Sequence, residues 1–136
     1  MKAMFCIYGE PQGKGRHRTA GGHEYTPEKT TIYENLVKTE YRLQSGVRFA
    51  DDAMLDVRIL AYYTIPKSAS QKKQRMMLDG IIRPIKKPDY DNIGKVICDA
   101  LNKIAYRDDA QVVDAQVRKF YSETPRVVVT ISDING

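Results

Sequence analysis

Residues 87–105 read KPDYDNIGKVICDALNKIA and have the strongest helical periodicity in the chain. Apolar side chains recur there at positions 93, 96, 97, 100, 101 and 104. That spacing predicts a helix with a wide apolar face that packs on a core. We expect the helix to run from Asn92 to Ala105, with Asp91 as its N-cap, because an aspartate side chain accepts hydrogen bonds from the free N–H groups of a first turn.

The polar residues of this helix fall on its other face. Asp91, Lys95 and Asp99 are four residues apart and Asn102 follows three residues later, so we expect all four to lie along one side. As a plain solvated face, this pattern would mean only a helix cap and one or two weak ion pairs.

More carboxylates flank the helix at both ends. Asp89 precedes it in an extended segment, and the pair Asp108-Asp109 follows it, just before a predicted strand. A short turn can return one of that pair toward Asp89 and Asp91. Capping explains Asp91 but leaves the other three aspartates unexplained. Because Mg²⁺ prefers oxygen ligands and would relieve the repulsion among converging carboxylates, we interpret the set as a metal site.

Positive charge is concentrated directly upstream of these acids. The segment 67–87 has seven basic side chains and one acidic one, a net charge of +6, whereas the whole chain carries +5. Such a tract can neutralise phosphates, although a solvated basic face is the simpler alternative. The candidate DNA contacts, which include three from a Gly/Pro-rich loop at residues 9–18, are Lys14, Arg16, Arg18, Lys72, Lys73, Arg75, Lys86 and Lys87.

The rest of the chain mixes strands and helices without strict alternation, which favours one α+β domain over residues 1–136. Strands are expected at residues 3–8, 54–65, 111–121 and 126–132. Apolar residues alternate along the second of these, which predicts one shared face for Leu55, Val57, Ile59, Ala61, Tyr63 and Ile65. A helix that Pro27 opens and Gly46 ends would have an apolar stripe of Ile32, Leu36 and Val37. A further helix within residues 67–79 would start at Ser68 or Ser70.

Composition narrows the class of protein. With 42% hydrophobic residues and 29% charged residues, the chain is that of an ordinary globular domain. Two cysteines, Cys6 and Cys98, suit buried thiols better than a disulfide framework or a zinc site. The absence of a long apolar run excludes a membrane span, and the N-terminus does not suit a signal peptide. We therefore expect a cytoplasmic protein.

Two other motifs are excluded by their spacing. Read as a calcium-binding EF-hand loop that starts at Asp89, the chain would place Ile93 and Ala100 at ligand positions, and neither can coordinate an ion. The Gly13-Lys14-Gly15 tripeptide lacks the spacing of a phosphate-binding P-loop and the Ser or Thr after its lysine.

The ordered motif KPDYDNIxK at 87–95, DALN at 99–102 and DDAQVV at 108–113 resembles the signature of the RusA-type Holliday junction resolvases. The loop at 9–18, the Tyr25-Thr26-Pro27 entry to the first helix and the basic segment 66–73 resemble that family less specifically. The resemblance implies a RusA-like fold, with a small mixed sheet of about four strands packed with two to three helices.

The resemblance also implies a homodimeric endodeoxyribonuclease that depends on Mg²⁺, with Mn²⁺ as an alternative, and nicks four-way DNA junctions in recombination and repair. Asp89, Asp91 and Asp109 then correspond to metal ligands and Lys95 to an essential lysine. Asp108 and Asp99 would support them. The residue before the first aspartate is basic in some members and is Pro88 here, so neighbouring lysines would supply the DNA contact.

Two other functions fit some of these features. A non-catalytic DNA-binding protein would account for the basic tracts but not for the ordered acids. A metal nuclease that acts on flaps, linear duplex or RNA would account for both.

Overall fold

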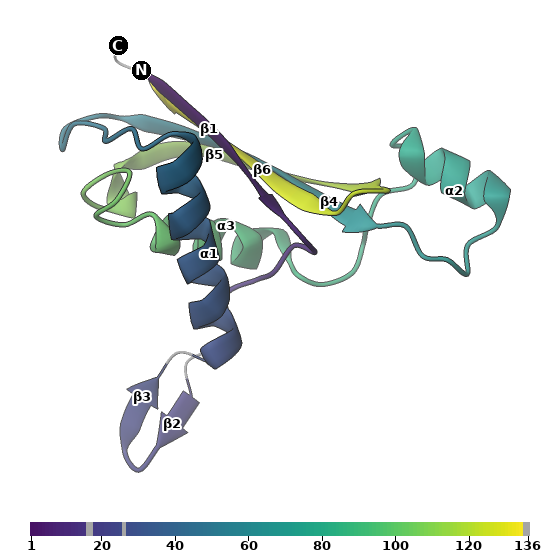
Figure 1. Ribbon diagram of the computed structural model, residues 1–136, viewed down its shortest axis with the longest axis horizontal. Helices are drawn as coiled ribbons and strands as arrows, with labels where there is room; N and C mark the ends of the chain where they lie inside the picture. The colour runs from purple at the N-terminus through teal and green to yellow at the C-terminus, as the bar shows by residue number, and fades with distance from the viewer. Residues whose placement is uncertain (16–17, 26, 135–136) are drawn as a thin grey trace.

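The computed structural model describes residues 1–15, 18–25 and 27–134, and its main element is a four-stranded mixed sheet with the order β1-β6-β4-β5. Helices α1 and α3 cover one face of this sheet, and α2 lies beyond its end (Figure 1). This arrangement confirms the α+β class. The elements of the sheet layer and its helices are β1 (Lys2–Tyr8), α1 (Glu28–Gln44), β4 (Leu55–Thr64), α2 (Gln71–Leu78), α3 (Tyr90–Ala100), β5 (Val112–Ser122) and β6 (Arg126–Asp133).

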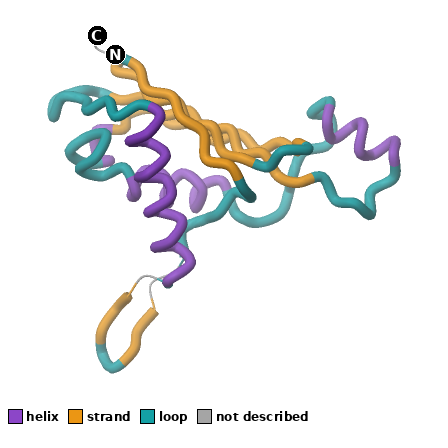
Figure 2. Tube along the Cα trace, viewed as in Figure 1, coloured by secondary structure: helices purple, strands orange, loops and turns teal. Residues whose placement is uncertain are grey.

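The strands pair in two different ways. β6 pairs antiparallel with β1 on one side and with β4 on the other. β4 and β5 are parallel, with Tyr62 opposite Phe120. A parallel pair requires a crossover connection, and the chain between Thr64 and Val112 makes it. This crossover contains α2 and α3 (Figure 2). It also contains all the predicted metal ligands, Asp89, Asp91 and Asp109.

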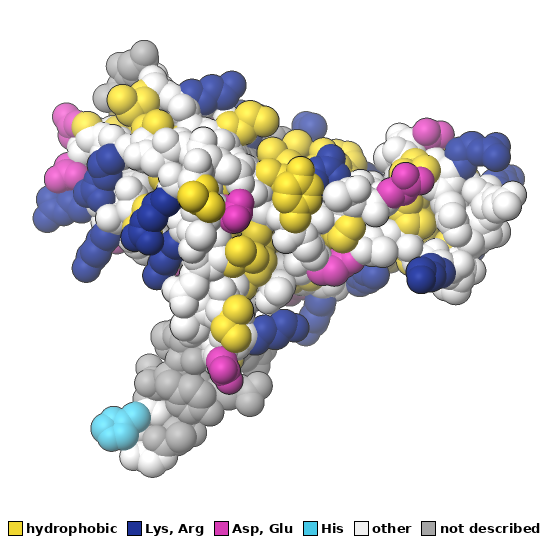
Figure 3. All heavy atoms as spheres, viewed as in Figure 1, with side chains coloured by type: hydrophobic (Ala, Val, Ile, Leu, Met, Phe, Trp, Pro, Cys, Tyr) yellow, Lys and Arg dark blue, Asp and Glu magenta, His cyan; other side chains and the backbone are white. Residues whose placement is uncertain are grey.

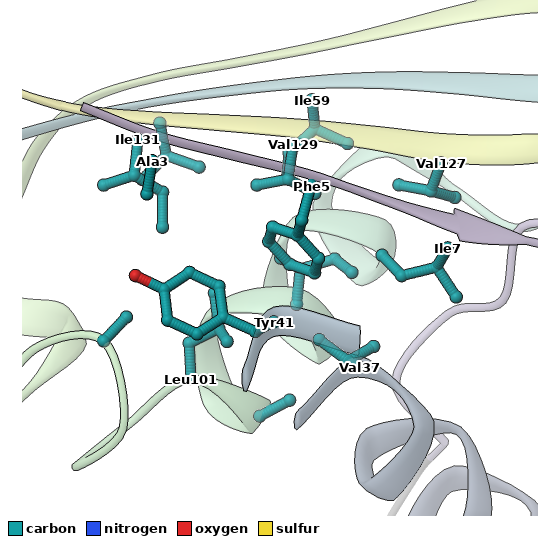
Figure 4. Close-up of a cluster of buried hydrophobic side chains, with 14 of the residues drawn as sticks. Ala3, Phe5, Ile7, Val37, Tyr41, Ile59, Leu101, Val127, Val129 and Ile131 are labelled. Atoms are coloured by element: carbon teal, nitrogen blue, oxygen red, sulfur yellow. The ribbon is translucent and has the colours of Figure 1, made fainter. Parts of the chain in front are cut away.

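The core lies between the helix-covered face of the sheet and the two helices. Alternate residues of β1, β4 and β6 point into it, as the alternating pattern of residues 55–63 predicted. Figure 4 shows side chains such as Phe5 and Val129 directed toward Val37 and Tyr41 of α1. The rings of Phe5 and Tyr41 meet edge to face at 5.1 Å, a favoured aromatic geometry.

The apolar face of α3 is confirmed, but both ends of the helix differ from the prediction. The helix begins at Tyr90 with Asp89, not Asp91, at the N-cap position, and it ends at Ala100. The sequence does not distinguish Asp89 from Asp91 as the cap, because both are aspartates just before the apolar pattern. In the structure Asp89 has the extended backbone of an N-cap residue, and the helix begins directly after it. At the other end Lys103 adopts a φ of 67°, which no α-helix can accommodate.

The predicted stripe of α1 is confirmed at Val37 and wrong at Ile32 and Leu36. Ile32 and Leu36 are 61% and 40% exposed, whereas Tyr33, Val37 and Tyr41 are buried. The buried Tyr33 and Val37 each follow an exposed residue of the predicted stripe by one position, which is a rotation of about 100° around the helix axis. Hydropathy favoured the aliphatic pair, but the tyrosines supply the larger contact area and bury instead.

Two smaller elements complete the comparison. Ser70 caps α2, its side chain accepting a hydrogen bond from the N–H of Lys73 at 3.2 Å, so one of the two predicted starts is confirmed. A separate hairpin of β2 (Arg18–Ala20) and β3 (His23–Tyr25) was not predicted. Its two-residue turn has positive φ at both positions, Gly21 and Gly22, as such hairpins require.

Two expectations from composition can also be compared with the structure. Cys6 and Cys98 are unpaired thiols, each only partly buried. In the described part of the chain, none of the helices has the length and apolar character that a bilayer span needs.

The corrected helix faces make a direct prediction about stability. Ile97 of α3 is fully buried and Ile32 of α1 is mostly exposed. We expect Ile97→Ala to lower the free energy of unfolding by about 2–5 kcal/mol, because it removes buried methyl groups and leaves a cavity. The matched Ile32→Ala variant should change it by less than about 0.5 kcal/mol. Urea denaturation followed by circular dichroism measures both; similar losses would contradict the assignment of the α1 face.

Candidate active site

A hollow of about 480 Å³ lies between the solvent-facing side of α3 and the edge strand β5. Asp91, Lys95 and Asp99 line it from successive turns of α3, so their predicted common face is confirmed. Asp109 lines it from the start of the short 3-10 helix η1 (Asp109–Gln111). Asn102 was predicted to extend the same face, but it lies beyond the end of the helix.

The structure brings Asp109 against Asp99. The backbone N–H of Asp109 donates to the side-chain oxygen of Asn102 at 2.8 Å, which holds the turn in place. Burial raises the pKa of Asp109, and the negative charges of Asp99 and Asp108 and a hydrogen bond with Asp99 raise it further. The sequence had suggested a turn back toward Asp89 and Asp91, which lie at the other end of α3.

Lys14 provides the counter-charge for Asp99. Its ammonium lies 2.8 Å from an oxygen of Glu34 on α1 and 3.3 Å from an oxygen of Asp99. Burial lowers the pKa of Lys14, but the contacts with Glu34 and Asp99 outweigh it and leave the pKa raised. Lys14 was predicted to contact DNA, and that contact stays a prediction; in the structure its side chain is 12% exposed and pairs with Glu34 and Asp99.

Asp89 lies at the N-terminal end of α3. Although it occupies the N-cap position, its side chain makes no capping hydrogen bond, so the helix does not use the carboxylate. Asp89 lines a second hollow, of about 550 Å³, together with Asp91. Asp91 lines both hollows, and along the axis it is roughly 12 Å from Asp99, eight residues later.

A buried tyrosine positions Asp89. The hydroxyl of Tyr63 on β4 donates to the carbonyl oxygen of Pro88 at 2.7 Å, and the Lys87–Pro88 peptide bond is cis. Burial, with a smaller contribution from the negative charge of Asp89, raises the pKa of Tyr63 well above its ordinary value. Tyr63 therefore stays protonated and remains a hydrogen-bond donor.

Lys119 is a residue of this region that the sequence reasoning missed. It lines the second hollow with Asp89 and Asp91, and its ammonium donates to the carbonyl oxygen of Lys86 at 2.6 Å. Burial lowers its pKa, while Asp89 acts in the opposite direction. The sequence did contain one signal for Lys119. It is paired with Ala61 of β4, so its side chain lies on the helix-covered face of the sheet, where a charged residue is unusual.

Asp108 has a structural role. Its carboxylate accepts from the N–H of Ala110 at 2.9 Å, and with Gln111 it forms a capping box at the start of η1. Such a box satisfies otherwise free N–H groups at a helix start. Asp108 thus holds the turn that positions Asp109, and its negative charge raises the pKa of Asp109.

The metal requirement can be tested against this geometry. No group of three or more His, Cys, Asp or Glu among the described residues is arranged to hold an ion. Mg²⁺ at a phosphate group, however, commonly takes only one or two carboxylates and completes its shell with water and substrate. The pairs Asp99–Asp109 and Asp89–Asp91 each meet this smaller requirement. Burial raises the pKa of Cys98 to about 11, so no thiolate competes for the ion.

Comparison with known proteins identifies the family. The model for Endodeoxyribonuclease RusA matches residues 8–132, which include both carboxylate pairs and Lys95. The chain belongs to the RusA family. A relative from Bacillus subtilis (strain 168), Uncharacterized protein YqaN, is 39% identical over 141 residues, or 97% of this chain and 96% of the relative. The resemblance of residues 87–113 is thus confirmed over nearly the whole chain.

RusA family membership supports a nuclease that acts on DNA junctions and, in general terms, a divalent metal cofactor.

The predicted DNA contacts differ in their location and in their exposure to solvent. Arg16 lies outside the described residues and Arg18 begins β2. Basic side chains lie at the end of the molecule that carries α2 and also at the opposite end, beside α1 (Figure 3). The predicted contacts that are exposed to solvent are Lys72, Lys73, Arg75, Lys86 and Lys87.

Two tyrosines of this RusA family member allow a matched test of how Asp89 is positioned. Tyr63→Phe removes a donor to Pro88 and should lower the free energy of unfolding by about 1 kcal/mol. Tyr33→Phe should leave it unchanged or raise it, because the buried Tyr33 hydroxyl has no hydrogen-bond partner among the described residues. Urea denaturation measures both values, and a larger loss for Tyr33→Phe would contradict this account.

The repulsion between Asp99 and Asp109 makes a second prediction. In EDTA at neutral pH, Asp109→Asn should raise the midpoint of thermal unfolding, because it removes a charge that the fold disfavours. The gain in the unfolding midpoint should disappear as the pH falls below the ordinary pKa of an aspartate, because the wild-type carboxyl is then protonated in both the folded and the unfolded state. Asp52→Asn, at an exposed loop position, serves as the control. A fall in the midpoint at neutral pH would refute the repulsion.

Proposed function

We propose that this protein is a magnesium-dependent endodeoxyribonuclease that resolves four-way DNA junctions by paired nicks, in recombination and repair. The observation that carries the proposal is the row of carboxylates with Lys95 along the exposed side of α3, in a chain of the RusA family. Neither an ordinary helix surface nor a purely DNA-binding protein requires carboxylates that repel one another in this way.

Asp89, Asp91 and Asp109 are the proposed metal ligands, and the contact with Asp109 adds Asp99 to them. The Asp89–Asp91 and Asp99–Asp109 pairs, at opposite ends of α3, would each hold an ion. A bound Mg²⁺ supplies a more acidic water and neutralises charge on the phosphoryl oxygens. The carboxylates hold their geometry before substrate arrives, since Lys14 fixes Asp99 and Tyr63 fixes the backbone before Asp89. In the hydrolysis, water adds to phosphorus and the bond to the 3′ oxygen breaks, leaving a 3′-hydroxyl and a 5′-phosphate.

Two lysines flank the proposed scissile phosphate. Lys95 is exposed in the middle of the carboxylate row, where its charge would stabilise the negative charge that develops in the transition state. Lys119 lies near Asp89 at the other hollow and would help position the phosphate. Mn²⁺ should replace Mg²⁺, because both accept carboxylate and water ligands.

The substrate has two equivalent strands to cut, and a two-fold homodimer would present one site to each of them. The dimer is therefore part of the proposal. Sedimentation of the free protein, and of its complex with one junction, measures the number of chains present.

The deciding experiment is cleavage of a synthetic four-way junction with Mg²⁺. Wild type should nick two opposed strands, and EDTA should abolish the reaction. Asp89→Asn should reduce the rate by at least about 10²-fold, the scale on which loss of an electrostatic catalytic group acts. Junction binding should remain, because the exposed basic residues are unchanged. Asp52→Asn should cleave like wild type.

The same assay separates the alternatives. Binding of the junction without Mg²⁺-dependent nicking, by wild type as well as the variant, would identify a non-catalytic DNA-binding protein. Faster cleavage of a flap, a linear duplex or RNA in competition with the junction would identify a metal nuclease with another substrate. Undiminished cleavage by Asp89→Asn would refute the assignment of the site.

A further inference from the structure

One face of the four-stranded sheet has no helix on it (Figure 1). On this open face, four planar side chains form a continuous stack across three strands and the α2–α3 connection. Its order is Arg83, Phe120, Tyr62 and Arg126, from the α2–α3 connection through β5 and β4 to β6. Strand register aligns the last three, because Tyr62 is opposite both Phe120 and Arg126. We call these four residues the arginine–aromatic stack.

The geometry of the stack is tight at both ends. The Arg83 guanidinium carbon lies 4.2 Å from the centre of the Phe120 ring, and that of Arg126 lies 4.1 Å from the centre of the Tyr62 ring. The two rings are stacked at 5.9 Å with an interplanar angle of 28°. Guanidinium groups that lie over aromatic rings are already ordered, so they lose little entropy when they bind a ligand.

Much of the hydrogen-bonding capacity of both guanidinium groups is unused. Arg83 donates through Nε to the carbonyl oxygen of Lys119, and Arg126 donates through Nη1 to Ser122 and Thr124. An arginine has five N–H donors, so each retains several. Within the described ranges, no carboxylate lies within ion-pair distance of either guanidinium.

Arg58 on the same open face shows the opposite arrangement. Its Nε and Nη2 bind both oxygens of Asp56, at 3.0 and 3.2 Å, and its Nη1 donates to Gln116 at 3.0 Å. That guanidinium is neutralised and satisfied within the sheet. The two arginines of the stack therefore differ from a structural arginine on the same surface, because they lack an anionic partner.

The position of the stack relates it to the candidate active site. β5 is an edge strand. The chain from Arg83 to Asp89 passes from the open face, where Arg83 stacks on Phe120, to the hollow beside Lys119 on the other side. Lys86 and Lys87, both exposed, lie between the two. Positive charge thus extends around the β5 edge from the open face to the carboxylates.

We propose that the arginine–aromatic stack is a binding site for the phosphate backbone of DNA, which holds a junction arm against the open face while the scissile strand lies at α3. The inference rests on the proposed function and adds a contact surface to it. Guanidinium edges match phosphate oxygens in geometry and charge. A purely structural stack would tie the end of the sheet together and would not change DNA affinity.

The test measures binding of a labelled synthetic four-way junction in EDTA over a series of salt concentrations. The variants are Arg83→Gln, Arg126→Gln and their combination, with Arg58→Gln as the matched control. Each stack variant should reduce the magnitude of the slope of log affinity against log salt by about one, and the double variant by about two. The reason is that each lost phosphate contact leaves about one counterion fewer to be released on binding. Arg58→Gln should keep the wild-type slope.

Circular dichroism and thermal unfolding of the same proteins keep the result interpretable. Arg126→Gln carries the test alone if the other variants do not fold, since Arg126 lies outside the 83–89 segment that leads to the active site. Unchanged salt slopes, with only a lower unfolding midpoint, would overturn the stack as a DNA site and leave the nuclease proposal intact. Failure of the wild-type protein to bind the junction at low salt would overturn both.

Discussion

The parallel pairing of β4 with β5 is the constraint on which the rest of this structure depends. A parallel strand cannot be reached by a tight turn, so the chain must return to the far end of the sheet before β5 begins. It does so through the crossover between Thr64 and Val112. That single segment carries the basic α2, the Asp89 turn, α3 and the Asp109 turn, so the sheet topology brings charge of both signs to one edge.

Docking of α3 onto the sheet determines how these charges are oriented. Ile93, Val96 and Ile97 are completely buried against the sheet, and their burial provides the dominant free energy that holds the helix in one rotation. The opposite face must then point outward with its carboxylates. The fold offsets part of their repulsion locally, through Lys14 at Asp99 and Lys119 near Asp89. The remaining repulsion at Asp109 is what a divalent cation would relieve.

Sequence reasoning succeeded where one physical signal dominated. The 3.6-residue period of α3 and the alternation of β4 each report burial directly, and both faces were predicted correctly. It failed where two signals competed. Tyrosines on α1 were passed over in favour of Ile32 and Leu36, and Asp91 was predicted as the N-cap of α3 where the structure has Asp89. The role of Lys14 was also missed, because its partners lie 20 and 85 positions away, on different helices.

The amino-acid sequence by itself determined the α+β class, the polar face of α3 and the RusA motif, because periodicity and motif spacing are local properties of the chain. Only the tertiary structure decided which carboxylates meet. It joined Asp109 to Asp99, separated both from Asp89 by the length of α3, and brought Lys119 and Tyr63 to the Asp89 turn. It also aligned Arg126, Tyr62 and Phe120 on the open face. These relationships depend on strand register and helix docking, which are long-range packing outcomes that no single segment encodes.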